Sequence, residues 1–272
     1  MPLSNVASPN QGTKIAMFQS FVEIEALSKA YTQAGMQTGV LHNVSMSFER
    51  GSFSAIVGPS GCGKTTLLSL LGALDTADSG SLVVDGLDLV RASKRDLTEY
   101  RRSAIGIVFQ FYNLLPTLTA LENVEAGLEF LPLNASARRA RALEWLDRVG
   151  MAHLAHRFPA QLSGGQQQRV AVARVLGRKP KLLLADEPTG NLDEESGERI
   201  FDCMKALQRE SGVTCIMVTH DTSLAEQVDR IVRLRDGRVL PDVLDESGEL
   251  PIVRRRESPP RETVVRFAGN WR

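Results

Sequence analysis

The sequence lacks a net charge and contains few cysteines. Its 32 Lys and Arg residues balance 32 Asp and Glu residues, so there is no electrostatic reason to expect nucleic acid or an anionic membrane as the main partner. The 3 cysteines are an odd and low number, which argues against a disulfide framework and favours a reducing compartment. Apolar residues make up 43% and charged residues 24% of the chain, and this balance excludes collagen-like, low-complexity and wholly disordered proteins.

The sequence also lacks the segments that direct a chain into a membrane. Its N-terminus has no basic stretch followed by an apolar one, so we expect no signal peptide. The longest apolar runs, such as residues 182–185, have the length of a strand and fall well short of the roughly 18 to 20 residues that span a bilayer. We therefore expect a cytoplasmic protein unless a partner holds it at a membrane.

The composition divides the chain into three regions. A length of 272 residues suits one or two domains, at about 150 residues each. Residues 1–20 are polar and aperiodic and are expected to form a flexible leader. Residues 21–240 carry regular patterns, whereas residues 241–272 mix Pro, Glu and Arg and are expected to form a flexible tail. A partner-binding or membrane role for the arginine run 254–256 is the alternative for this tail.

Strand and helix patterns alternate through the middle region. Apolar alternation or continuous apolar runs predict strands at 21–27, 41–48, 52–57, 81–84, 105–109, 181–185 and 213–219. Helices are predicted at 65–74, 135–149, 166–176 and 194–210, and the composition is helical from 111 to about 158. The apolar face expected for the helix at 135–149 consists of Ala137, Ala140, Leu143, Leu146 and Val149. The alternation of strands and helices predicts an α/β fold with a parallel sheet.

A glycine-rich segment follows the predicted strand at 52–57. Residues 58–65 fit the phosphate-binding pattern G-x-x-x-x-G-K-[ST] and join a strand to a helix, as the pattern requires. The glycines let the backbone turn its N–H groups inward, and the helix start adds the positive end of its dipole. We expect Lys64 to reach the β- and γ-phosphates of a nucleotide and the Thr65 hydroxyl to bind Mg²⁺. A purely structural Gly-rich turn is the alternative, and it leaves Lys64 and Thr65 without a role.

Cys62 lies within this segment, close to Lys64 and to a helix N-terminus. Both features stabilise a thiolate, so one hypothesis is a reactive thiol that a bound nucleotide would protect. An inert small residue is an equally good interpretation.

Two carboxylates end the predicted strand at 181–185. In a doubly wound sheet the carboxyl ends of the strands open onto the ligand crevice. Asp186 is therefore expected to hold Mg²⁺, directly or through water, and Glu187 to orient and deprotonate an attacking water. Two surface acids at a strand end are the alternative, and the phosphate-binding segment in the same chain makes it the weaker one.

A second anion-binding helix start occurs at residues 162–166, with the sequence LSGGQ. Ser163 is a good N-cap, and the glycines after it leave backbone N–H groups exposed. The phosphate-binding segment followed by LSGGQ resembles the ATP-binding cassette (ABC) family, over about residues 21–240. The resemblance implies a P-loop NTPase fold: a RecA-like core with a parallel sheet, an N-terminal antiparallel β subdomain and an inserted helical subdomain at about 111–160. A small-molecule kinase would have no reason to carry LSGGQ.

The resemblance assigns further residues by position. Gln110 matches the Q-loop glutamine, which touches Mg²⁺ and faces a transmembrane partner. Asp193 lies in a segment that matches the D-loop, and His220 matches the switch histidine that contacts the γ-phosphate. Tyr31 lies where the family stacks an aromatic ring on adenine, although a plain core or edge aromatic is the alternative. The catalytic set implied in this way is Glu187, His220 and Gln110, and the metal set is Thr65, Gln110 and Asp186. The implied nucleotide-binding set is Gly58, Pro59, Ser60, Gly61, Cys62, Gly63, Lys64, Thr65, Thr66, Tyr31, Ser163, Gly164, Gly165, Gln166 and Asp193.

The function implied by the resemblance is that of an ATP-binding and ATP-hydrolysing subunit of a transporter. Two chains would pair head to tail around ATP and Mg²⁺, each nucleotide lying between one cradle and the partner's LSGGQ. The homodimer would drive a separate permease from the cytoplasmic face of the plasma membrane, and no nucleic acid partner is expected.

Two segments indicate a branch of the family. Residues 110–124 and 188–193 resemble the lipoprotein-releasing, macrolide-exporter and cell-division ATPases, which favours an exporter or mechanotransmission system. The alternative is a regulatory ABC ATPase that couples hydrolysis to cell-division or cell-wall machinery through a membrane partner. Soluble ABC proteins that act on ribosomes or DNA are disfavoured, because this chain has one cassette and no long coiled coil.

Overall fold

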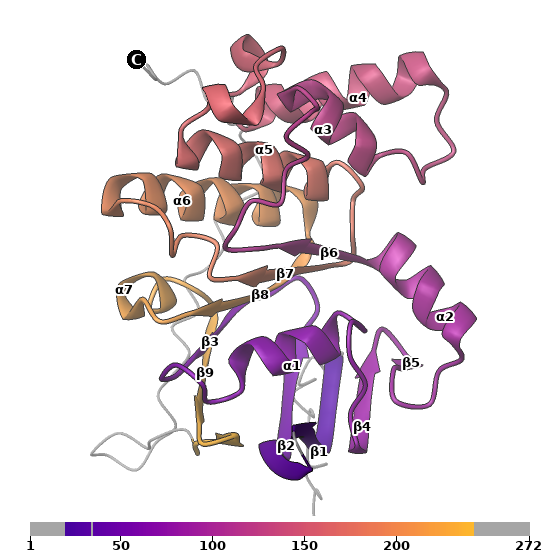
Figure 1. Ribbon diagram of the computed structural model, residues 1–272, viewed down its shortest axis with the longest axis vertical. Coiled ribbons are helices and arrows are strands. Elements are labelled where there is room, and N and C mark those ends of the chain that lie inside the picture. Colours follow the sequence, from indigo (N-terminus) through magenta and orange to yellow (C-terminus); the bar gives the residue numbers. More distant parts are fainter. Residues whose placement is uncertain (1–19, 34, 242–272) are drawn as a thin grey trace, which may run out of the picture.

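Two sheets organise the computed structural model, which describes residues 20–33 and 35–241 (Figure 1). The first sheet has the order β2-β1-β4-β5 and is antiparallel. Its strands are β1 (Ser20–Gln33), β2 (Met36–Glu49), β4 (Ser79–Val84) and β5 (Leu87–Asp88). The second sheet has the order β10-β9-β3-β8-β7-β6 and is parallel except for the pair β9–β10. Its strands are β3 (Phe53–Val57), β6 (Ile105–Val108), β7 (Leu182–Asp186), β8 (Thr214–Thr219), β9 (Arg230–Arg235) and β10 (Arg238–Val239).

The helices divide between the two faces of the parallel sheet. Helix α1 (Lys64–Leu71) lies on the face toward the antiparallel sheet, and α5 (Gly164–Leu176) and α6 (Glu194–Ser211) cover the opposite face (Figure 1). An outer layer of α3 (Ala120–Gly127) and α4 (Ala135–Arg148) packs on α5. The remaining helical segments are α2 (Lys94–Glu99), a π-turn at Tyr100–Ala104, 3₁₀ turns at Ala152–Leu154 and Pro159–Gln161, and α7 (Thr222–Ala225).

Alternation along the central strands creates two separate cores. In β7, Leu183 and Ala185 pack into the cluster that includes α3 to α6, whereas Leu182 and Leu184 pack into the cluster that includes α1 and the antiparallel sheet. Successive side chains of a strand point to opposite faces, so a strand that is covered on both sides must be apolar throughout. The parallel core, the N-terminal antiparallel sheet and the inserted helical layer confirm the fold that the sequence predicts.

The apolar face predicted for the helix at 135–149 is partly wrong. Leu143 is 38% exposed and Ala137 and Ala140 are exposed, whereas Ala142, Trp145 and Leu146 are buried. A strict spacing of three residues turns by about 60° at each step around a helix of 3.6 residues per turn, so it cannot stay on one face. The buried residues of α4 instead follow the i, i+3, i+4 pattern of an amphipathic helix.

Other elements were missed or fall outside the described residues. The strands β5, β9 and β10 and the helices α2 and α7 were not predicted, because each is short or carries many charges. The leader expected at 1–20 and the tail expected at 241–272 lie outside the described residues, apart from Ser20 at the start of β1 and Pro241. Among the described residues, no helix combines the length and the apolar character needed to cross a bilayer.

Candidate nucleotide-binding site

The carboxyl ends of four neighbouring parallel strands lie at one edge of the second sheet. Strand β3 leads into the loop at 58–63, β8 into His220, β7 into Glu187, and β6 through Phe109 into Gln110. The pairing of β3 with β8, β8 with β7, and β7 with β6 is parallel and without a register shift. The sheet therefore gathers on one edge groups that are far apart in the sequence.

The loop at 58–63 is folded around the Lys64 side chain. The Lys64 Nζ atom donates hydrogen bonds to the carbonyl oxygens of Gly58 and Pro59, both at 2.9 Å, and the side chain is buried. A Cβ atom at position 58 would lie 2.0 Å from the carbonyl oxygen of Leu234, so only glycine fits there. Gly63 has φ 103° and is the N-cap of α1 without any side-chain cap, which leaves the first N–H groups of this helix for a ligand.

The Cys62 side chain is buried, and its Sγ atom lies against Gly58, where a Cβ atom would approach it to 2.8 Å. It is 4% exposed and belongs to the cluster formed by α1 and the antiparallel sheet. A buried thiol is shielded from oxidants and alkylating reagents, so the structure does not support the hypothesis of a reactive cysteine. Only the backbone of Cys62 can serve as part of an anion-binding loop.

Two oxygen ligands of the kind that Mg²⁺ prefers lie side by side. The Thr65 hydroxyl, in the first turn of α1, donates to Asp186 Oδ1 at 3.2 Å. Burial raises the pKa of Asp186 above its ordinary value, and the nearby Glu187 charge adds to this, against the opposing effects of Thr65 and Lys64. A cation between these residues would relieve the cost of a partly buried carboxylate, so the donor set fits the metal.

Glu187 has an unusual backbone conformation for a residue with a side chain. Its φ is 45°, in the left-handed region, and the next residue is Pro188. The Glu187 N–H donates to the Val218 carbonyl at 2.9 Å, and its own carbonyl accepts from Gly190 N–H at 3.0 Å. This conformation directs Glu187 Oε2 to His220 Nδ1 at 3.2 Å.

Gln110, which follows β6, also lies close to the Glu187 carboxylate. Its Nε2 donates to Asn191 Oδ1 at 3.3 Å, and Asn191 Nδ2 donates back to the Gln110 carbonyl at 3.1 Å. A Cβ atom on Gly190 would lie 3.0 Å from Gln110 Nε2 and 3.2 Å from Glu187 Oε2. The structure thus brings the predicted residues Glu187, His220 and Gln110 together, and it adds Asn191, which is 81 positions from Gln110 in the sequence.

The LSGGQ segment begins α5 as a capping box. Gln166 N–H donates to Ser163 Oγ at 3.3 Å, and Ser163 N–H donates to Gln166 Oε1 at 2.9 Å. These hydrogen bonds stay within the segment, and in the described part of the chain none of them reaches the loop at 58–63. A Cβ atom on Gly164 would lie 2.6 Å from the Tyr112 hydroxyl, so a side chain there would require Tyr112 to shift.

Asp193 caps the next helix, α6. Its Oδ1 accepts a hydrogen bond from Ser196 N–H at 2.9 Å, and hydrogen bonds from Ser196 hold the pKa of Asp193 below its ordinary value. The structure therefore gives Asp193 a capping role, and it leaves the carboxylate at the surface beside the exposed Asn191.

Tyr31 connects the antiparallel sheet to α1. Its hydroxyl donates to Asp75 Oδ2 at 2.7 Å and also bonds with Thr66, while Lys29 Nζ lies 5.0 Å from the ring centroid. The ring is 42% exposed, so part of it is accessible to a ligand. Lys29 Nζ also donates to Asp75 Oδ1 at 3.0 Å.

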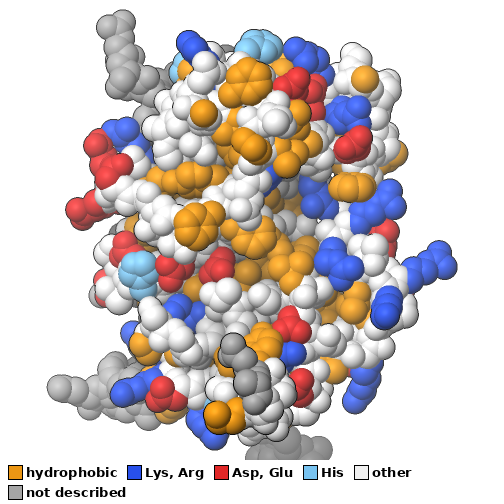
Figure 2. Space-filling view, in the orientation of Figure 1, with side chains coloured by type: hydrophobic (Ala, Val, Ile, Leu, Met, Phe, Trp, Pro, Cys, Tyr) orange, Lys and Arg blue, Asp and Glu red, His pale blue; other side chains and the backbone are white. Residues whose placement is uncertain are grey.

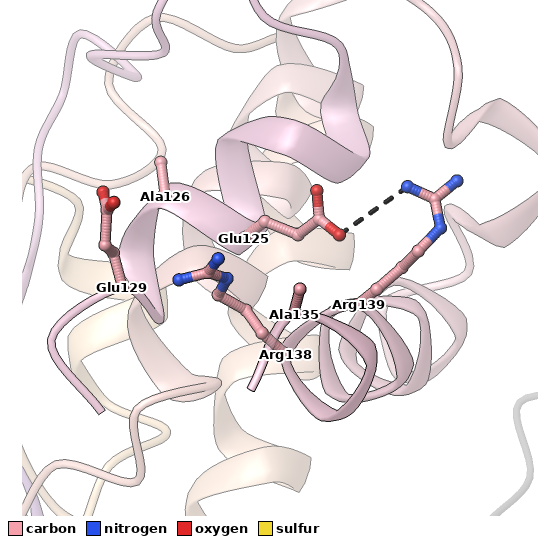
Figure 3. A pocket seen from close by; sticks show the side chains of 6 residues that line it. All are labelled: Glu125, Ala126, Glu129, Ala135, Arg138 and Arg139. Atoms are coloured by element: carbon pink, nitrogen blue, oxygen red, sulfur yellow. Dashed lines mark ion pairs between the residues drawn. The ribbon is translucent and has the colours of Figure 1, made fainter. Parts of the chain in front are cut away.

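A surface hollow in the helical layer lies apart from the loop at 58–63. Figure 3 shows Glu125 of α3 pointing toward Arg139 of α4, at 3.7 Å, with Glu129 and Arg138 beside them. Charges of both signs line this hollow, and none of its lining residues belongs to the predicted site.

Comparison with known proteins gives consistent matches. A model of the ABC transporter family matches residues 41–190. An uncharacterized ABC transporter ATP-binding protein of Mycobacterium tuberculosis is 42% identical over 225 residues, which is 83% of this chain and 91% of that protein. YvrO, an uncharacterized ABC transporter ATP-binding protein of Bacillus subtilis, is 43% identical over 224 residues, 82% of this chain and 96% of its own. Among solved structures, the ATP-binding cassette MJ0796, as a post-hydrolysis dimer bound to ADP and Pi, is 42% identical with a TM-score of 0.75, covering 81% of this chain and 97% of that one.

The Tyr31–Asp75 contact predicts a pH-dependent contribution to stability. Burial opposes ionisation of Asp75, but the hydrogen bonds from Tyr31 and Lys29 outweigh it and hold its pKa below the ordinary value of 3.8. A carboxyl group of this kind stabilises the fold above its unfolded-state pKa, and the contribution is lost as the pH falls through the folded-state pKa. We expect Asp75→Asn to unfold more easily in urea at pH 7, by about 1 to 2 kcal/mol, and this gap should close below pH 3.8. A gap of constant size, or an equal one for the exposed Asp147→Asn, would contradict this account.

Proposed function

The chain belongs to the ABC transporter family as an ATP-binding subunit, and from this premise we propose how its own residues bind and hydrolyse ATP. The subunit is an ATPase that works with a separate transmembrane partner. The convergence of Glu187, His220 and Gln110 at the sheet edge that carries the phosphate-binding loop is the observation that supports the residue assignments best.

The loop at 58–63 and the start of α1 bind the phosphates. The uncapped N–H groups after Gly63 and the Lys64 ammonium neutralise the β- and γ-phosphates, and the Lys64 bonds to two loop carbonyls hold the loop in its curved form. Thr65 and Asp186, together with Gln110, would hold Mg²⁺, and the metal would supply charge neutralisation at the phosphates. The exposed part of the Tyr31 ring stacks on the adenine, near the first turn of α1, where Thr66 meets the Tyr31 hydroxyl.

Glu187 is the general base of hydrolysis. Its carboxylate accepts a proton from water while the water oxygen attacks the γ-phosphorus, and the bond from that phosphorus to the bridging oxygen of ADP breaks. His220 Nδ1, at 3.2 Å from Glu187 Oε2, fixes the orientation of the carboxylate and lies where it can contact the γ-phosphate. Gln110 positions the water and senses whether the phosphate is present.

The site is completed by a second copy of the chain. Ser163, Gly164 and Gly165 present a helix start that the chain's own phosphate-binding loop does not use. In a head-to-tail pair each LSGGQ segment meets the partner's loop, so ATP is held between two subunits and Asp193 lies close to their contact. The dimeric post-hydrolysis state of MJ0796 supports this arrangement for a 42% identical protein.

A groove beside Gln110 is the proposed contact with the permease. Its volume is about 330 Å³, and its lining includes Leu74, Ile107 and Phe109. Apolar side chains gather on the face of the molecule shown in Figure 2, and Phe111 and Phe130 are 70% and 62% exposed. Arg101, Arg174 and Arg178 also line the groove. Exposed aromatic side chains and arginines are both enriched at protein interfaces.

Arg174 connects this groove to Gln110. Its guanidinium lines the groove and donates to the carbonyls of Asn113 at 2.6 Å and Tyr112 at 3.1 Å, so a shift of the groove wall moves the segment after Gln110. We assign the subunit to the cytoplasmic face of the membrane through this contact, in an exporter or mechanotransmission system. Residues 110–124 and 188–193 support that branch.

Replacing the general base should separate binding from hydrolysis. Glu187→Gln keeps the size of the side chain and removes the proton acceptor, so we expect ATP affinity to be retained and turnover to fall by about 10² to 10⁴. ATP-bound chains should then accumulate as dimers in size-exclusion chromatography. Glu144→Gln, an exposed acid on α4, is the matched control and should turn over normally. Normal turnover by Glu187→Gln would assign the base to another residue.

A negative charge introduced beside the groove should weaken binding of the subunit to its permease. Phe111→Glu adds a carboxylate to the exposed aromatic next to Gln110, and we expect co-purification with the permease and permease-dependent stimulation of ATPase activity to be lost. Met36→Glu, at a side chain that is 75% exposed at the tip of the antiparallel sheet, is the control and should behave like the parent. Equal co-purification of both variants would place the permease contact elsewhere.

A further inference from the structure

A buried amide lies beneath the catalytic groups. Gln168, on α5, is 0% exposed. Its Nε2 donates to the Pro188 carbonyl at 2.6 Å and to the Phe109 carbonyl at 3.3 Å. Pro188 follows Glu187 directly, and Phe109 precedes Gln110 directly. One side chain therefore holds the backbone next to two of the residues proposed for hydrolysis.

The orientation of this amide is fixed by its partners. Both contacts are carbonyl oxygens, which accept hydrogen bonds, so the NH₂ group must face them. The Gln168 Oε1 atom is left buried without a hydrogen-bond partner within the described residues. A buried acceptor without a partner is unfavourable. The two hydrogen bonds from Nε2 to the Pro188 and Phe109 carbonyls hold the amide in this orientation despite that cost.

The backbone at Glu187 needs such a constraint. A side-chain-bearing residue at φ 45° is in a sparsely populated region, and the proline that follows restricts it further. Conformations of this kind persist only where the surroundings determine them from several directions. The Val218 carbonyl holds the N–H of Glu187 on one side, and Gln168 holds the carbonyl of Pro188 on the other.

The same amide connects β6 to β7 below the site. Gln110 and Asn191 are joined by two hydrogen bonds at the exposed surface, and Gln168 joins Phe109 and Pro188 in the interior. Hydrogen bonds therefore connect the segments around Gln110 and Glu187 both at the surface and in the interior. Gln168 lies on α5, the helix that begins with LSGGQ, so the buried hydrogen bonds link that helix to both segments.

We propose that Gln168 is a positioning residue, which holds Glu187 and Gln110 in the relative placement that hydrolysis requires. Its side chain is fully buried and acts through the Pro188 and Phe109 carbonyls. The inference rests on the proposed role of Glu187 as the base. Loss of the amide should therefore reduce the rate of the chemical step and leave nucleotide binding intact.

The chain contains a matched control for this buried contact. Gln208, on α6, is 5% exposed, and its Nε2 donates to the Gly51 carbonyl at 2.6 Å and to the Val213 carbonyl at 3.3 Å. Gly51 and Val213 lie just before β3 and β8, at the sheet edge opposite to the site. Gln208 thus makes the same pair of bonds at the same distances, away from the catalytic groups.

The test compares Gln168→Met with Gln208→Met in the full-length chain with ATP and Mg²⁺. Methionine has nearly the same length and shape as glutamine but cannot donate. We expect both variants to melt at a lower temperature than the parent. Only Gln168→Met should lose kcat, by at least about tenfold, with KM and the Kd of a fluorescent ATP analogue within about twofold of the parent.

A double variant provides a second readout. If Gln168 acts by placing Glu187, then Gln168→Met should slow hydrolysis no further in a Glu187→Gln background, because the base to be placed is already absent. If Gln168→Met does not fold, Gln168→Asn keeps an amide but is shorter by one carbon–carbon bond, about 1.5 Å. It cannot reach both carbonyls and should show the same loss of kcat.

Several outcomes would overturn the inference. A folded Gln168→Met or Gln168→Asn variant with parental kcat would do so, and so would an equal loss of kcat in Gln208→Met or an additive loss in the double variant. Full turnover by Glu187→Gln would overturn the proposed role of Glu187, and this inference with it. An inactive Glu187→Gln beside a fully active Gln168→Met would overturn the inference alone.

Discussion

The parallel register of β3, β8, β7 and β6 is the constraint on which the site depends. Each of these strands is buried on both faces, so its apolar side chains fill two cores and its backbone groups pair with its neighbours. A shift of one residue would exchange the two sets of side chains between the cores. The same register fixes where each strand ends, and it therefore fixes the distance between Glu187 and His220 and the approach of Gln110. The stability of the core and the geometry of the chemistry have one cause.

The charged side chains at the carboxyl ends of these strands are held in fixed positions by hydrogen bonds and by the backbone. Lys64 is buried and bonded to the loop that it follows, Asp186 is paired with Thr65, and Glu187 is held at a positive φ. A site whose charged groups are oriented before the substrate arrives spends less free energy on reorganisation during the reaction. The helix start at 163–165 is the exception, because its N–H groups do not serve the loop of their own chain. That separation makes a single subunit incomplete and explains why the family works in pairs.

Local patterns made much of this predictable from the sequence. The glycine-rich loop, the capping residue Ser163 and the acidic end of β7 depend on neighbours within a few positions, and their elements are confirmed. Contacts between distant segments were not predictable. The Gln110–Asn191 bond spans 81 positions and the Gln168–Phe109 bond spans 59, and neither leaves a pattern in the sequence. The burial of Cys62 was missed for a similar reason, since it depends on how α1 packs against the antiparallel sheet.

The central claim is that two copies of the chain build each ATP site, one supplying the loop at 58–63 and the other supplying LSGGQ. The most direct measurement mixes two inactive variants, Lys64→Ala and Ser163→Arg, and follows ATP hydrolysis. Half of the dimers in an equal mixture should be mixed, and each of these should hold one intact site, so the account predicts that activity returns to about a quarter of the parental rate. Activity that stays at the mean of the two separate variants would contradict it.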